Sequence, residues 1–252
     1  MNPTITDLYK SSFIKAVILA NKKLFSYINN ELKNEDLNYC EKIGFGGDKT
    51  LNIDLIAENI FIKYLEIFGN IYSEECGRLS NDKKFDIIID PLDGSDNFSS
   101  NLPYYGTSVA LVYKNETIAG FVCNLVSGVL TYRAFDDNIK KEYFFENRDT
   151  LILSENKKIG IFERAYSFPE ICTRLKHEKL KFRSPGAVAL SLCDAKNYDF
   201  VLFAGNIREF DILASLYICN DLFLYKTDKF VLITENKQKF FQIKEIIKNN
   251  WL

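Results

Sequence analysis

The chain has 252 residues, enough for one large domain or for two subdomains that share a cleft. Its 32 basic and 34 acidic residues give a formal net charge of −2, and no basic stripe stands out, so we expect no nucleic-acid partner. The longest apolar runs fall far short of the ~18 residues that cross a bilayer, and the N-terminus does not resemble a secretory signal. We therefore expect a cytoplasmic protein with no membrane partner.

The N-terminal half is predicted to combine helices with an antiparallel sheet. Apolar residues recur at helical spacing in two segments, the first with Thr6 as a candidate cap, and a polar turn separates the segments. The run "DIIID" is continuous and apolar, which is typical of a strand buried on both faces. The expected helices are 4–33 and 52–68, the turn is 45–50, and the expected strands are 71–77, 86–90, 107–113, 117–125 and 128–135.

The C-terminal half is predicted to alternate strands and helices. Residues 136–160 are polar and irregular, which places a subdomain boundary near 145–150 and divides the chain into 1–147 and 148–252. Beyond it, short strands such as "IGIFE" and "DFVLFAG" alternate with helical stretches such as "GAVALSLCDA" and "FDILASLYICN". The amphipathic stretch "KQKFFQIKEIIKN" is expected to be a terminal helix. This alternation favours a layered α/β arrangement.

The residues that could perform chemistry are mostly carboxylates. The chain has six cysteines without a CxxC pair, and we expect them to be reduced thiols. The one histidine, His177, lies in a charged stretch and reads as a solvated helix residue. A Ser-His-Asp triad or a His-rich zinc site would have to use it, so an enzyme built from this sequence would depend on acids instead.

Three acids follow the apolar run in "FDIIIDPLDGSDNF", residues 85–98. Pro91 lacks an amide hydrogen and fixes its own φ, so the strand must turn there and can aim Asp90 and Asp93 at one point. Carboxylates gathered in this way suit Mg²⁺ or Mn²⁺, whereas a solvated acidic turn is the alternative. An EF-hand is excluded, because counting from Asp93 gives no glycine at position 6 and no glutamate at position 12.

The residues after these acids could bind an anion. Gly94 permits a close backbone approach, and "GSDN" is typical of a helix start, where free amides can hold a phosphate. A cation site and an anion site side by side are what metal-assisted hydrolysis of a phosphate ester requires.

The stretch "DPLDGSDNF" resembles the signature D-P-[ILV]-D-G-[ST]-x-N-[FY] of the magnesium-dependent, lithium-sensitive sugar-phosphatase superfamily, which includes inositol monophosphatases, fructose-1,6-bisphosphatases and bisphosphate nucleotidases. "YSEECG" is similar to the family's paired glutamates, and "REFDILAS" to its W-D-x-A-[AS] motif. "GGDKTLNIDLIAENI" and "RSPGAVALSLCDA" are similar to segments of the archaeal-type inositol monophosphatase/fructose bisphosphatase branch. The resemblance spans about residues 44 to 220.

The resemblance implies a fold and a set of roles. The fold would be an α/β/α/β/α sandwich of two subdomains, with the metal and phosphate site in 1–147, and with Asp211 and substrate contacts from 148–252. Two or three Mg²⁺ ions, or Mn²⁺ in their place, would be held by Glu74, Asp90, the Leu92 carbonyl, Asp93 and Asp211. Glu74 and Ser95 would orient the attacking water, with Asp54 hydrogen-bonded to Ser95, and the amides of Gly94 and Ser95 would hold the phosphate. Water activated by the metal would attack phosphorus directly, without a phosphoenzyme.

Each of these positions also has a structural interpretation. Asp211 and Asp54 could cap helices, and Glu74 could be a surface acid. Arg183 and Arg208 could bind a second phosphate or sugar hydroxyls, or could be surface charges. The family's motif tryptophan is Phe210 here, and the Gly-Gly turn that usually follows the motif is missing, which bears on the substrate pocket.

The expected function is that of a magnesium-dependent phosphomonoesterase acting on inositol 1-phosphate or fructose 1,6-bisphosphate. A 3'(2'),5'-bisphosphate nucleotidase ranks lower, because "KTLNID" replaces that branch's S-P-V-T-x-A-D segment. A non-catalytic relative that binds phosphate ligands is the remaining alternative. We expect a homodimer, as is common in the family.

Overall fold

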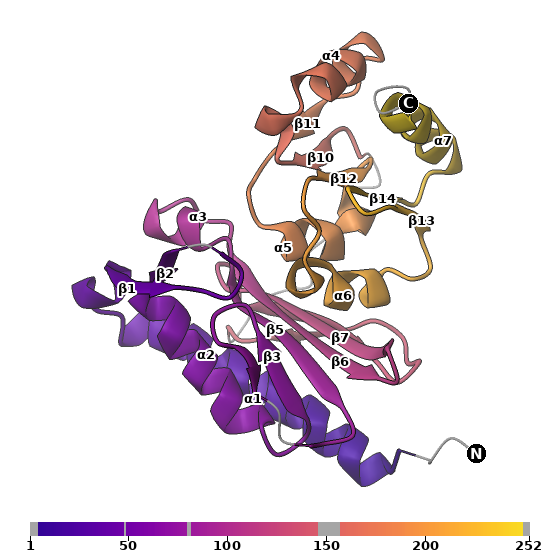
Figure 1. Ribbon diagram of the computed structural model, residues 1–252. Coiled ribbons are helices and arrows are strands. Elements are labelled where there is room, and N and C mark those ends of the chain that lie inside the picture. The colour runs from indigo at the N-terminus through magenta and orange to yellow at the C-terminus, as the bar shows by residue number, and fades with distance from the viewer. Residues whose placement is uncertain (1–4, 48, 80–81, 146–156, 249–252) are drawn as a thin grey trace.

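The computed structural model describes residues 5–47, 49–79, 82–145 and 157–248. Within these residues, the protein is built in five layers, helix–sheet–helix–sheet–helix, which confirms the predicted α/β/α/β/α sandwich (Figure 1). The predicted boundary at 145–150 lies almost entirely outside the described residues, so the division into 1–147 and 148–252 stays a prediction.

The larger sheet has seven strands in the order β4-β3-β5-β6-β7-β8-β9, and only the β3–β5 pair is parallel. Helices α1 and α2 cover one face of this sheet (Figure 1). The strands are β3 (Asn70–Ser73), β4 (Gly77–Leu79), β5 (Asp86–Asp93), β6 (Gly106–Tyr113), β7 (Glu116–Asn124), β8 (Val129–Ala134) and β9 (Lys140–Tyr143), and the helices are α1 (Asp7–Asn30) and α2 (Asn52–Leu65).

The smaller sheet has five strands in the order β11-β10-β12-β14-β13. Helices α4 and α7 pack on its outer face, whereas α5 and α6 fill the layer between the two sheets. The strands are β10 (Gly160–Glu163), β11 (Phe182–Arg183), β12 (Val201–Ala204), β13 (Phe223–Lys226) and β14 (Phe230–Thr234), and the helices are α4 (Pro169–His177), α5 (Val188–Cys193), α6 (Glu209–Ile218) and α7 (Lys237–Lys248).

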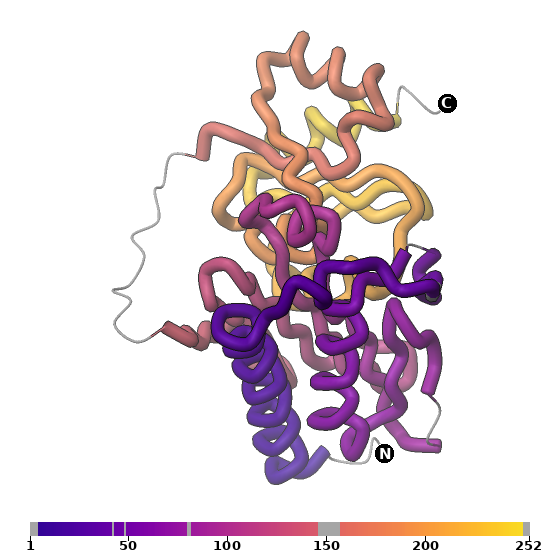
Figure 2. The backbone as a smooth tube through the Cα atoms, turned by 90° about the vertical axis from the view of Figure 1, so that its left-hand side faces the viewer, coloured from indigo at the N-terminus to yellow at the C-terminus, as the bar shows by residue number. Residues whose placement is uncertain are grey.

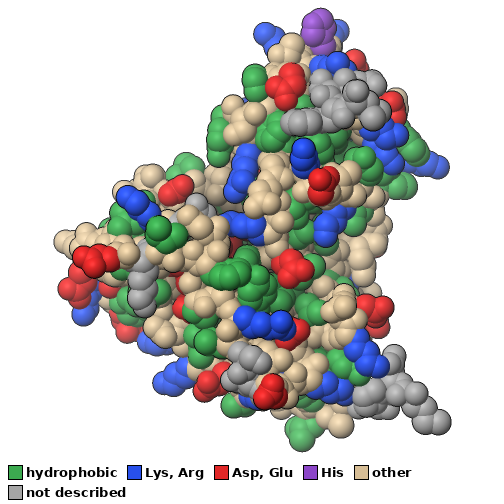
Figure 3. All heavy atoms as spheres, in the orientation of Figure 1, with side chains coloured by type: hydrophobic (Ala, Val, Ile, Leu, Met, Phe, Trp, Pro, Cys, Tyr) green, Lys and Arg blue, Asp and Glu red, His purple; other side chains and the backbone are tan. Residues whose placement is uncertain are grey.

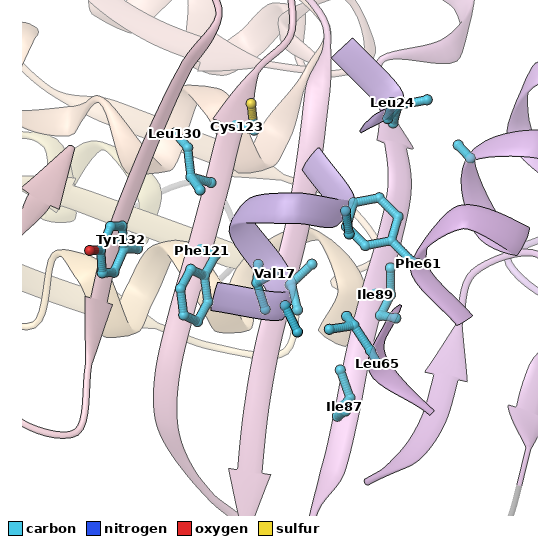
Figure 4. Packing of buried hydrophobic residues seen from close by; sticks show 14 of the residues in the cluster. Val17, Leu24, Phe61, Leu65, Ile87, Ile89, Phe121, Cys123, Leu130 and Tyr132 are labelled. Atoms are coloured by element: carbon cyan, nitrogen blue, oxygen red, sulfur yellow. The ribbon is translucent and has the colours of Figure 1, made fainter. Parts of the chain in front are cut away.

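Strand β5 is buried on both faces, as its continuous apolar run predicts. Alternate side chains point to opposite faces of a strand, so Ile87 and Ile89 enter the core under α1 and α2. Ile88 faces the other way, into the core that contains α5 and α6. Figure 4 shows the first of these cores, where side chains of β5, β7 and β8 meet those of α1 and α2.

The remaining elements lie near the junction of the two halves or along the edges. A short hairpin is formed by β1 (Tyr39–Ile43) and β2 (Lys49–Leu51), and α3 (Ser95–Ser99) follows β5 directly. The hairpin segment, indigo in Figure 2, lies at the height where the two halves meet. Single turns of 3₁₀ helix occur at Asn34–Leu37, Ala165–Ser167 and Ala195–Asn197.

Most of the predicted elements are present, with shifted ends. Thr6 caps α1, since its hydroxyl accepts a hydrogen bond from the Tyr9 amide at 3.2 Å. Sequence reasoning missed β1, β2, β4 and β9, which are short strands at the edges of the fold. No helix in the described part of the chain has the length and apolar character needed to span a bilayer.

Candidate metal and phosphate site

A cavity of about 370 Å³ opens where the two halves meet. Its lining includes every residue proposed above for the site except Arg183: Asp54, Glu74, Asp90, Leu92, Asp93, Gly94, Ser95, Arg208 and Asp211. These residues come from four separate stretches of the chain, so the fold has to assemble the cavity.

Glu74, Asp90 and Asp211 form the acidic group at the centre of the cavity. Each offers an oxygen within 4.8 Å of those of the other two. Glu74 follows β3 and continues its parallel pairing with β5, because its amide donates to the Ile89 carbonyl at 3.1 Å. Asp90 lies in β5 and Asp211 in the first turn of α6. Their spacing suits oxygen ligands that share a divalent cation.

The position of Asp90 follows from the alternation of β5. Asp90 is two residues beyond Ile88, so its side chain leaves the same face of the sheet, toward α6. The hydroxyl of Ser108, which is paired with Asp90 across β5 and β6, donates to the Phe210 carbonyl at 2.9 Å. This bond ties the start of α6 to the sheet beside Asp90, which brings Asp211 close.

Asp93 is not a member of that acidic group among the described residues. A bulge in β5 between Asp90 and Asp93 shifts the register, and the two Asp93 oxygens accept hydrogen bonds from the amides of Val188 at 2.9 Å and Leu190 at 3.1 Å. Asp93 therefore joins β5 to the start of α5. It lines the cavity, and its predicted role as a metal ligand stays a prediction.

Burial controls the electrostatics of these acids. Burial raises the pKa of Glu74 to about 7, although the nearby Arg208 opposes the shift. The pKa of Asp90 is also well above its usual range, because it is buried and faces Glu74. Buried carboxylates that repel one another are costly unless positive charge compensates them, so the donor set fits a hard divalent cation.

Arg208 supplies part of that positive charge. Its guanidinium binds both oxygens of Asp211, with two N–O distances of 3.0 Å, and it contacts Glu74 at 2.5 Å. The prediction gave Arg208 a role in gripping substrate. Here it is paired with two acids of the central group, and its contact with substrate stays a prediction.

The chain that leaves β5 forms a tight loop beside the acids. Gly94 has a φ of 87°, and a Cβ there would lie 3.1 Å from both the Ala187 Cβ and the Tyr104 carbonyl, so a larger residue would be strained and crowded at this position. Asn97 donates to the carbonyls of Tyr104 at 2.7 Å and Pro185 at 2.8 Å. The loop at 94–97 is therefore held against the loop at 185–187, and Gly94 and Ser95 face the cavity between them.

Asp54 caps the start of α2 and also faces the cavity. One of its oxygens accepts from the Leu51 amide at 2.8 Å, and the other is buried without a hydrogen-bond partner among the described residues. That oxygen makes no hydrogen bond to Ser95 in this structure, so the predicted contact between Asp54 and Ser95 stays a prediction. Burial raises the pKa of Asp54 to about 7.

Arg183 lies outside the cavity. Its side chain is exposed on β11, and it donates to the carbonyl of the preceding Phe182 at 2.8 Å. His177 is exposed as well, at the far end of α4 (Figure 3).

Several residues that line the cavity were missed, above all Glu163, Arg164 and Lys49. Glu163 is only 1% exposed, and it accepts from the Gly186 amide at 2.9 Å and the Ser191 hydroxyl at 2.5 Å. An acid at the end of the apolar run "IGIFE" is the same signal that drew attention to Asp90, and it could have identified Glu163. Arg164 and Lys49 had no comparable signal.

Comparison with known proteins gives consistent matches. The model of the "Inositol monophosphatase family" matches residues 10–222. A fructose-1,6-bisphosphatase/inositol-1-monophosphatase of Methanothermobacter thermautotrophicus is 31% identical over 215 residues, 74% of each chain. Its counterpart in Methanocaldococcus jannaschii is 28% identical over 207 residues, 77% of each chain. The structure of the Thermotoga maritima IMPase superposes with a TM-score of 0.75 at 21% identity, covering 94% of this chain and 98% of that one, which supports the fold alone.

Proposed function

Since the chain belongs to the inositol monophosphatase family and is a phosphoric monoester hydrolase, we propose that it uses Mg²⁺ to hydrolyse a small sugar or inositol phosphate. The observation that carries this proposal is the group of Glu74, Asp90 and Asp211, whose oxygens lie within 4.8 Å of one another in a largely buried cavity. A phosphate dianion cannot approach three carboxylates unless positive charge lies between them.

Glu74, Asp90 and Asp211 would hold a first cation, and Asp93 and the Leu92 carbonyl would complete the ligand set. When bound, Mg²⁺ supplies positive charge for the transferring phosphoryl group and lowers the pKa of water. An all-oxygen donor set favours Mg²⁺ or Mn²⁺ over zinc. The number of ions, two or three, is part of the proposal.

The other residues of the cavity would position the reactants. The amides of Gly94 and Ser95 face the cavity and would donate to phosphate oxygens. Glu74 and the Ser95 hydroxyl would orient a water for attack on phosphorus. Asp54 has a buried oxygen without a partner, and it would accept a hydrogen bond from Ser95 once substrate is bound.

Phosphate release from inositol 1-phosphate and fructose 1,6-bisphosphate, measured with Mg²⁺ and with EDTA, tests the proposal. Asp90→Asn removes a charge from the central group and should lower kcat/KM by about 100-fold or more. Asp86→Asn is the matched control in the same strand, because Asp86 pairs with Arg78 away from the cavity. We expect it to retain activity.

Thermal melting provides a second measurement. Mg²⁺ should raise the melting temperature of the wild type and of Asp86→Asn, but not that of Asp90→Asn. Equal activity of Asp90→Asn and wild type would contradict the metal assignment. No release from a broad panel of phosphate esters would favour the non-catalytic relative, and faster release from 3'-phosphoadenosine 5'-phosphate would favour the nucleotidase.

A further inference from the structure

The cavity has buried acids in its interior and cations nearer to its opening. Asp90 and Asp211 are 2% and 1% exposed, whereas Lys49 and Tyr166 are exposed and Arg164 is half-buried. Lys and Arg side chains are visible around the junction of the two halves in Figure 3. The more exposed part of the lining therefore contains two cations, Lys49 and Arg164, beside the exposed acid Asp96.

The two arginines that line the cavity differ in whether they form ion pairs with acids of the protein. Arg208 is paired with Glu74 and Asp211. The Arg164 side chain makes no hydrogen bond or ion pair with any described residue. Burial raises the pKa of the neighbouring Glu163, and the positive charge of Arg164 opposes that shift to a smaller extent. Its guanidinium is thus available to a ligand.

Contacts of its backbone neighbour and of its own guanidinium restrict the position of Arg164. Its backbone is left-handed, with a φ of 58°, which is unusual for a residue other than glycine and often marks a functional position. The preceding Glu163 is fixed by the Gly186 amide and the Ser191 hydroxyl. The guanidinium itself lies over the Phe203 ring, 5.5 Å from its centre. These contacts reduce the conformational freedom that Arg164 would lose on binding.

We propose that Arg164 binds a second anionic group of the substrate, so that this enzyme prefers a sugar bearing two phosphates to one bearing a single phosphate. The inference rests on the proposed function, which places the scissile phosphate at Gly94, Ser95 and the acids. A guanidinium binds a phosphate through two parallel hydrogen bonds, and Arg164 lines the same cavity from the opposite half of the chain. Lys49, also at the opening, adds a second positive charge to this end of the cavity.

Two substrates separate this role from general catalysis. Arg164→Gln should raise KM for fructose 1,6-bisphosphate by about 10- to 100-fold and leave kcat within about threefold, because the lost contact lies away from the reacting phosphorus. With inositol 1-phosphate, which has no second phosphate, KM should change by less than about threefold. Arg164→Lys keeps the charge but loses the paired hydrogen bonds, so its KM for the bisphosphate should be intermediate.

Arg174→Gln is the matched control, since Arg174 is an exposed arginine of α4 outside the cavity, and it should change neither KM. An equal rise in KM for both substrates in Arg164→Gln, or unchanged kinetics on both, would overturn the proposal. If Arg164→Gln does not fold, the same comparison is made with Arg164→Lys. These results are distinct from a failure of the proposed function, in which the wild-type protein itself would release no phosphate from either substrate with Mg²⁺.

Discussion

Asp54 is a buried carboxylate in an environment that disfavours its negative charge. It is 2% exposed, and one of its carboxylate oxygens has no hydrogen-bond partner in the described part of the chain. Burial raises its pKa from 3.8 to about 7. The folded protein therefore holds the Asp54 proton more tightly than the unfolded chain does. Its contribution favours folding below about pH 4 and is lost as the pH rises to about 7.

Asp54→Asn should remove this contribution. In EDTA, the free energy of unfolding of the wild type should fall between pH 4 and pH 7, and the fall should be smaller in Asp54→Asn by on the order of 1–4 kcal/mol. Urea denaturation at several pH values measures the slope, with Asp86→Asn as the control because Asp86 is ion-paired and partly exposed. Identical slopes for Asp54→Asn and wild type would show that Asp54 is not protonated in the folded state.

The difference between Arg183 and Arg164 shows what a sequence leaves undecided about single residues. Arg164 follows the predicted strand "IGIFE", and Arg183 precedes the predicted helical stretch "GAVALSLCDA". The guanidinium of either residue could bind a phosphate. Arg183 is exposed, whereas Arg164 lines the cavity. The direction of a side chain depends on the register of its strand and on the conformation of the turn that follows, and neither pattern nor composition specifies the left-handed φ of Arg164.

The β1–β2 hairpin is the element that covers the acids. The amides of Phe45 and Gly46 donate to the carbonyls of Glu75 at 3.1 Å and Glu74 at 2.8 Å. A Cβ on Gly46 would lie 2.7 Å from the Glu74 side chain, so the loop passes directly over this acid. The Phe45 ring packs edge-on against Tyr72 at 5.6 Å and Phe210 at 6.5 Å, rings that lie close in the chain to Glu74 and Asp211.

Phe45→Ala should release this loop without unfolding the protein. Phe45 is 60% exposed, so the loss of its two ring contacts should cost about 1 kcal/mol or slightly more. The amides of Phe45 and Gly46 should exchange with solvent about 10-fold faster. Because the loop would no longer be packed against Glu74, kcat/KM should fall by about 5- to 50-fold. Hydrogen exchange and phosphate-release kinetics measure the two effects.

Phe241→Ala on α7 is the control for the hairpin, since Phe241 is 54% exposed and contacts Phe240 away from the cavity. It should leave both measurements unchanged. Unaltered exchange at Phe45 and Gly46 in Phe45→Ala would mean that the backbone hydrogen bonds alone hold the hairpin.

Strands and helices with strong patterns were predicted well, and the hairpin was not. The strands at 107–113 and 117–125 correspond to β6 and β7, because alternating apolar residues and a turn with Lys114 and Asn115 at positive φ specify a hairpin locally. In contrast, β1 and β2 are short and polar, and residues 45–50 resemble a loop. Their structure depends on pairing with one another and on contacts to Glu74 and Glu75, which are distant in the sequence.

The two halves of the molecule share the middle layer of helices. Ile88, Ala110 and Val122 of the larger sheet lie in one core with Phe203 and Val231 of the smaller sheet. Helices α5 and α6 also lie in that core, between the sheets. The C-terminal half therefore covers an apolar face of the N-terminal half, and the acid Asp211 reaches the cavity from it.

A chain of residues 1–147 alone should consequently fail to fold cooperatively. Removing 148–252 uncovers the face that contains Ile88, Ala110 and Val122, and such a loss of apolar burial costs far more than the net stability of a domain. Thermal melting by circular dichroism should show no sharp transition for 1–147, and coexpression with 148–252 should restore one. A cooperative transition for 1–147 alone would instead support a predicted subdomain that folds independently.

Taken by itself, the sequence determined the family, the layered architecture and the acids that could hold a cation, because a motif such as "DPLDGSDNF" combines a buried strand, a turn and a helix start within nine residues. Only the tertiary structure decided which charged groups meet. Asp93 binds the amides of α5, Arg208 pairs with Glu74 and Asp211, and Arg164 instead of Arg183 lines the cavity. The physical reason is that local pattern specifies which face of an element is buried, whereas contacts between charges distant in the chain depend on how the layers pack.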